Sequence, residues 1–270
     1  MKKINFKKIG LLVLWIAVVS GIVVTLGFVN AEEKEVRGKS VSININNENE
    51  SEFIDEDDVR DFLKERQDTL VNQPMKEINV YELEKALNAH PAVAKAEVSV
   101  DINGAVNIDL KQRKPIVRLM IYSGESYYID EEARLMPLSE NYTARVLVAN
   151  GFIFEKYSMF YQATVKELMK DTSFERIAVL DDIYKVAAYI VNDTLLNNLI
   201  QQVYVNADKE LELYPVVGGH KIIFGKGEDI EEKFRKLKIF YKEGLNSINN
   251  WNKYSVINLK YKDQVVCTKK

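Results

Sequence analysis

Few residues of this sequence have the types and spacing that catalysis or metal binding requires. The chain contains two histidines, His90 and His220, and one cysteine, Cys267. Neither histidine has a neighbour in the sequence that would complete a metal pair or a nucleophile–base pair. A single cysteine cannot form an intrachain disulfide or a site built on several thiolates. The residues alone therefore make no positive case for an enzyme or for a bound cofactor or metal.

The remaining candidates for chemistry have simpler structural explanations. The acidic run 130–132 could clamp a metal ion, but its position is typical of a solvated turn. The Gly225-Lys226-Gly227 segment precedes a predicted helix, but it lacks the GxxxxGK[ST] spacing of a phosphate-binding loop. His90 lies at the end of a predicted helix, where a cation favours the helix dipole. His220 follows two glycines in a predicted strand, and we expect it to pack there.

The first 29 residues predict a membrane anchor. Residues 1–9 hold four lysines and no acid, and residues 10–29 hold no charge. Twenty helical residues span about 30 Å, the thickness of a hydrocarbon core. The lysines place residues 1–9 in the cytoplasm and residues 32–270 outside it. A cleaved signal peptide is the alternative, because Val29-Asn30-Ala31 could be a cleavage site, but its apolar core is usually about 7–15 residues long.

A chain of 270 residues has room for about two domains, and residues 38–114 predict the first. The alternating run 41–46 favours a strand, and Asp55 and Asn79 are typical helix N-caps. Two alternating segments flank Asn103-Gly104, which predicts a tight hairpin turn with positive φ angles. The order strand, helix, helix, strand, strand fits two helices on a three-stranded sheet.

Residues 115–268 predict a second, larger domain, a mostly antiparallel sheet with a few helices. Helical spacing of apolar residues is clear in 180–193 and again in 228–245. The chain then ends on YSVINLKYKDQVVCTKK, residues 254–270, which alternates like a strand, turns at Lys262-Asp263 and alternates again. The overall prediction is an α+β protein, and the net charge of -3 gives no sign of nucleic-acid binding.

The terminal strand raises a question of exposure, because an edge strand has unpaired N–H and C=O groups. A partner that adds a strand would gain main-chain hydrogen bonds and side-chain selectivity. The lysines at positions 260, 262, 269 and 270 would discourage self-pairing and attract an acidic partner. The alternative is a final strand that only completes the sheet, with its lysines in solvent.

Several segments together resemble the FtsQ/DivIB family of bacterial division proteins. Residues 87–119 resemble the family's passage from the second helix of its POTRA domain into its β domain. The segments YYIDEEARLMPL, residues 127–138, and ARVLVANG, residues 144–151, are similar to the entry of that β domain. The helix 228–245 and the closing INLKYKDQVV complete the order.

The resemblance implies a non-enzymatic scaffold without a cofactor, held in the inner membrane at the division septum with most of the chain in the periplasm. Family members bind the small coiled-coil membrane proteins FtsB and FtsL by strand addition at the C-terminal end. The positions that match this contact are Lys260, Tyr261, Val265, Val266, Cys267 and Thr268. The family often has arginine at position 260, and lysine cannot make the same two-pronged contact with a carboxylate.

Two other functions stay open at this point. The first is a POTRA-bearing factor for protein export or envelope assembly, although no series of about ten-residue amphipathic strands predicts a barrel. The second is a membrane-anchored extracytoplasmic cell-wall enzyme. Such an enzyme would need a nucleophile or a pair of acids in a cleft, and the sequence nominates none.

Overall fold

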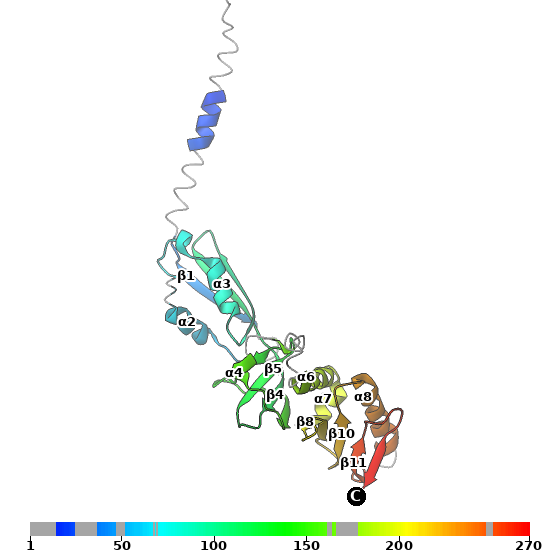
Figure 1. The fold of residues 1–270 in the computed structure, drawn as a ribbon. Helices are drawn as coiled ribbons and strands as arrows, with labels where there is room; N and C mark the ends of the chain where they lie inside the picture. Colours follow the sequence, from blue (N-terminus) through cyan, green and yellow to red (C-terminus); the bar gives the residue numbers. More distant parts are fainter. Residues whose placement is uncertain are drawn as a thin grey trace, which may run out of the picture. The chain divides into compact units, whose positions relative to one another are not determined.

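A computed structural model describes residues 15–24, 37–46, 52–66, 68, 70–160, 164–165, 178–246 and 251–270. The chain forms two compact units (Figure 1). The first contains Met1–Asn46 and Ile54–Lys111, and the second contains Asn47–Phe53 and Gln112–Lys270. Residues 15–24 are helical. Within the described ranges no helix combines the length and the apolar composition that a membrane span needs, and the rest of the expected segment 10–29 and the tail 1–9 lie outside them.

The first unit has the predicted order of elements around a three-stranded sheet. Its elements are β1 (Ser40–Asn46), α2 (Glu56–Glu65), the short η1 (Met75–Glu77), α3 (Val80–Asn88), β2 (Val93–Val100) and β3 (Ala105–Gln112). The strands lie in the order β1-β3-β2, and β1 runs parallel to β3. This arrangement confirms the expected βααββ module.

Local signals in the sequence explain where these helices begin. The backbone N–H of Asp58 donates to Asp55 Oδ1 at 2.8 Å, and Asp58 Oδ2 accepts the N–H of Asp55 at 3.0 Å, so α2 starts with a capping box. Asn79 caps α3 with one bond, since its Oδ1 accepts the N–H of Glu82 at 3.2 Å. The β2–β3 hairpin differs from the prediction in one respect. We expected positive φ angles at both Asn103 and Gly104, but only Gly104 has one, at 90°. The turn is longer than expected, since the N–H of Gly104 donates to the Asp101 carbonyl.

The second unit contains one nine-stranded sheet in the order β12-β11-β10-β9-β8-β7-β4-β5-β6. Its strands are β4 (Pro115–Met120), β5 (Ser126–Asp130), β6 (Leu135–Met136), β7 (Leu147–Gly151), β8 (Ile200–Val205), β9 (Leu211–Pro215), β10 (Lys221–Gly225), β11 (Tyr254–Asn258) and β12 (Val266–Lys269). The β4–β7, β7–β8 and β10–β11 pairs are parallel. The other pairs are antiparallel, which agrees with the mostly antiparallel sheet that we predicted.

Helices cover one face of this sheet. They are α4 (Tyr157–Phe160), α6 (Ala178–Val191), α7 (Thr194–Leu199), α8 (Ile230–Ile239) and the π-helical η3 (Phe240–Asn246). We had expected one regular helix over 228–245, but its second half is the π-helical η3. The ring of Phe234 on α8 packs 4.9 Å from that of Phe224 on β10. The other face is more polar, and there Lys221 donates to both carboxylate oxygens of Glu212 at 3.0 Å.

Candidate interaction site at the C-terminal edge strand

Strand β12 lies at the edge of the nine-stranded sheet. It pairs antiparallel with β11, with Cys267 opposite Ile257 and Val266 opposite Asn258, and no described strand lies on its other side. Alternate residues of an edge strand direct their N–H and C=O groups away from the sheet. The strand therefore offers an unpaired backbone edge of the kind that strand addition uses.

The side chains of β12 alternate between the two faces of the sheet. Cys267 is half-buried against the hydrophobic core, opposite the fully buried Ile257. Val266, 43% exposed, and Thr268, also exposed, lie on the open face. Burial raises the pKa of the Cys267 thiol, which keeps it protonated at neutral pH. Of the predicted strand residues, Val266 and Thr268 are thus the accessible ones.

Lys260 has an unexpected partner within the chain. Its Nζ donates to Glu210 Oε1 at 2.6 Å, and its backbone N–H donates to Asn258 Oδ1 at 3.0 Å. Gly225 leaves room for its aliphatic stem, since a Cβ at Gly225 would lie 3.0 Å from Lys260 Cγ. An acidic partner would have to compete with Glu210 for this ammonium. The neighbouring Tyr261 is half exposed.

A groove of about 480 Å³ lies between the α8–η3 helix and the turn before β12. Val265, a predicted site residue, lines it and packs partly against the core. Ile239, 50% exposed, lies off the buried stripe of α8 and is the sequence signal that could have revealed the groove. Gly244 keeps it open beside Phe240, because a Cβ there would lie 3.0 Å from that ring. The lining residues are Arg235, Lys236, Ile239, Phe240, Glu243, Gly244, Asp263, Gln264 and Val265.

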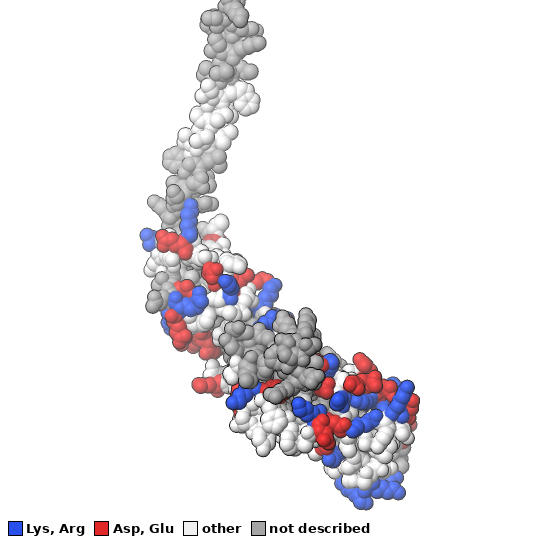
Figure 2. All heavy atoms as spheres, viewed as in Figure 1, with Lys and Arg blue, Asp and Glu red and all other residues white. Residues whose placement is uncertain are grey.

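Positive charge gathers at this end of the second unit. Figure 2 shows basic side chains where the chain terminates. Lys262, Lys269 and Lys270 are exposed, and their side chains form no ion pair within 4.0 Å with any described carboxylate. Because attraction between exposed charges is screened by salt, these lysines would speed encounter with an acidic partner more than they would strengthen a bound state.

The two histidines have structural roles. His220 is buried, and its Nε2 lies 2.9 Å from the hydroxyl of Tyr241; burial lowers its pKa, which agrees with the expected packing role. His90 corrects our expectation of a cation. Its Nδ1 accepts the N–H of Ala92 at 3.3 Å, and burial lowers its pKa, so the ring is neutral at pH 7.

The acidic run at 130–132 leads into the turn that we expected, with Glu131 and Glu132 exposed, but Asp130 is buried. Asp130 is 1% exposed, and its Oδ2 accepts a hydrogen bond from Arg113 Nη1 at 2.9 Å. Its Oδ1 accepts the backbone N–H groups of Glu132 and Arg134 at 2.9 and 2.7 Å. Burial is the main reason that the pKa of Asp130 is raised. In the described part of the chain no three His, Cys, Asp or Glu side chains are grouped to hold a metal ion.

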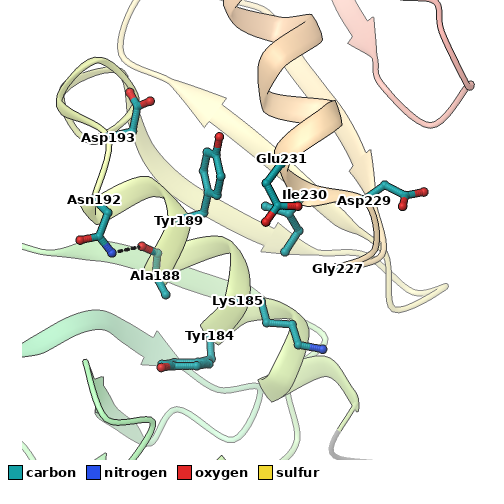
Figure 3. Close-up of a pocket in the computed structure, with 10 residues that line it drawn as sticks. All are labelled: Tyr184, Lys185, Ala188, Tyr189, Asn192, Asp193, Gly227, Asp229, Ile230 and Glu231. Carbon is teal, nitrogen blue, oxygen red and sulfur yellow. Dashed lines mark hydrogen bonds between the residues drawn. The ribbon is translucent and has the colours of Figure 1, made fainter.

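A second groove, of about 680 Å³, lies between α6 and the start of α8 (Figure 3). Side chains beside this groove already contact one another: the Tyr189 ring stacks on Phe234 at 4.9 Å, and Lys238 donates to Asp193 at 2.7 Å. The charged groups drawn in Figure 3 do not converge on one point. This groove therefore has no arrangement that indicates catalysis.

The two units define a class of protein in which a POTRA-like module precedes a larger β domain. A family model for the POTRA-like domain matches residues 37–111. A model described as FtsQ/DivIB, C-terminal related, matches residues 114–268, which is more than half of the chain. The chain therefore belongs to the FtsQ/DivIB family of cell-division proteins. No curated protein matches it. This family consists generally of non-enzymatic scaffolds that interact with other division proteins.

Proposed function

We propose that this protein is a single-pass membrane scaffold of the division complex that binds an FtsB/FtsL-like coiled-coil pair by strand addition to β12. The open edge of β12 is the observation that carries the proposal. The partner contributes one extended segment, which pairs with the outer edge of β12 and extends the sheet. The protein organises septal cell-wall synthesis by holding its partners and has no catalytic step of its own.

The membrane part of the proposal is supported by the composition of the first 29 residues. The uncharged run 10–29 crosses the inner membrane as a helix, and the four lysines before it remain in the cytoplasm. Both folded units then lie in the periplasm, at the division septum. The helical state of residues 15–24 is consistent with this placement.

The proposed contact uses both faces of the terminal strand. On the open face, the partner strand packs its side chains beside Val266 and Thr268. On the helix face, the groove lined by Val265 and Ile239 accepts an apolar side chain, while Tyr261 packs at the margin. Lys262 and the final two lysines attract acidic residues that flank the partner segment.

The test is a binding measurement with a matched pair of variants of the full-length chain. Val266→Asp places a carboxylate on β12, whereas Val217→Asp makes the same change in the same unit at a residue of nearly equal exposure, 44% against 43%. We expect Val266→Asp to abolish capture of the FtsB- and FtsL-like proteins and Val217→Asp to leave it intact. Equal capture by both variants would contradict a contact at β12.

A further inference from the structure

Lys236 on α8 holds the backbone that leads into β12. Its Nζ donates to the carbonyl oxygens of Tyr261, at 2.6 Å, and Leu259, at 3.2 Å. These carbonyls lie on either side of Lys260, so one ammonium fixes three consecutive residues just after β11. The Lys236 side chain is only 9% exposed, and its nearest carboxylate, Glu232, is 3.9 Å away. Its strongest interactions are therefore with the backbone of the turn.

The turn needs this support because β12 makes few stabilising contacts of its own. The strand has four residues, it pairs on one side only among the described strands, and Cys267 is its one side chain that packs against the core. The connection between β11 and β12 contains Asp263 with a φ of 56°, a left-handed conformation that Asp tolerates better than most residues with a side chain. Charge-assisted hydrogen bonds are stronger than neutral ones, and here they act where the connection begins.

We infer that Lys236 is a positioning residue that keeps the β11–β12 hairpin in the geometry required for strand addition. This inference rests on the proposed function, because it assigns Lys236 a part in the same contact. Lys236 also lines the groove beside β12, but its ammonium is bound to the carbonyls of Leu259 and Tyr261 and is therefore not available to the partner strand. It acts by raising the fraction of molecules in which β12 lies along β11, ready for an incoming strand.

The size of the effect follows from that fraction. Apparent affinity falls in proportion to the population of the competent state, so a hairpin in place for about a tenth of the time binds about tenfold more weakly. The loss appears in the association rate, because the Lys236 ammonium that Lys236→Met removes binds the turn carbonyls and not the partner. A residue that only stabilised the second unit as a whole would not alter association selectively while the unit remained folded.

The experiment uses the full-length chain with Lys236→Met, which keeps the stem and removes the ammonium. Lys242→Met is the matched control, since this lysine lies on the adjoining η3 with a side chain 81% exposed. Lys236→Arg restores a charged donor. Amide hydrogen exchange of residues 265–269 is measured in each free protein, and binding rates are measured with the FtsB- and FtsL-like proteins as probes.

The expected result is faster exchange of residues 265–269 in Lys236→Met alone, with about a tenfold lower association rate and an unchanged dissociation rate. Lys236→Arg should recover most of both losses. Unchanged exchange in Lys236→Met, or a loss confined to dissociation, would overturn the inference. A wild-type protein that binds neither probe would overturn the proposed function, and exchange would still decide whether Lys236 holds the hairpin.

Discussion

The buried ion pair between Arg113 and Asp130 gives a quantitative test of how the second unit is held together. Both side chains are nearly inaccessible, at 8% and 2%, and their closest atoms are 2.9 Å apart. Arg113→Met removes the only described cation within 4.0 Å of this carboxylate. Loss of one partner from a buried pair costs about 3–5 kcal/mol, since it leaves an uncompensated charge. Two backbone N–H groups still bond Asp130, so we expect about 3 kcal/mol.

Urea unfolding followed by the fluorescence of Trp251, the one tryptophan of the second unit, measures this cost. The double variant Arg113→Met/Asp130→Asn should be more stable than Arg113→Met alone, because an amide needs no counter-ion. Lys114→Met is the control, since its contact with Glu131 is 3.8 Å long and exposed and should contribute less than about 1 kcal/mol. An Arg113→Met protein as stable as the control, or no recovery in the double variant, would refute the reasoning.

Three further predictions concern other parts of the chain. The pKa of His220 in the folded protein lies below its unfolded value of 6.5, so the free energy of unfolding decreases as pH drops through 6.5. In urea titrations at pH 7.5 and 5.5, His220→Gln should lose less of this free energy between the two pH values than wild type. Equal losses in the two proteins would contradict this. Asp55→Ala should destabilise the first unit by about 1 kcal/mol in thermal unfolding, whereas Asp57→Ala, which removes a first-turn acid without a cap bond, should cost less. Because the pKa of Cys267 is raised, its thiol should react with a disulfide reagent at pH 8 more slowly than the free thiol of glutathione does. An equal rate would contradict this, since it would show an exposed thiolate.

The features that sequence predicted well are governed by local physics. Asp55 and Asn79 begin helices because their side chains bond N–H groups three residues on, and such short-range bonds are readable from spacing. The alternation on both sides of Gly104 likewise fixed the β2–β3 hairpin. The edge position of β12 was harder to foresee, since it depends on the parallel pairing of β10 with β11 across the whole of α8 and η3.

The parts of the candidate site that the sequence did not predict come from segments far away in the chain. Glu210, which binds Lys260, is 50 residues away in the chain, and Lys236 reaches a backbone carbonyl 25 residues away. Nothing in the terminal seventeen residues indicates either contact, because the geometry arises only when β9, α8 and β11 pack together. The burial of Asp130 was missed for the same reason, since its partner Arg113 lies across a strand pair.

The most direct test of strand addition is the protection of β12 amides from hydrogen exchange when the partner binds. In the full-length chain, addition of the FtsB- and FtsL-like proteins should slow exchange at residues 266–269, because new main-chain hydrogen bonds form along the outer edge of β12. Exchange in the first unit should change little. Tight binding of these proteins with no added protection at residues 266–269 would contradict the account.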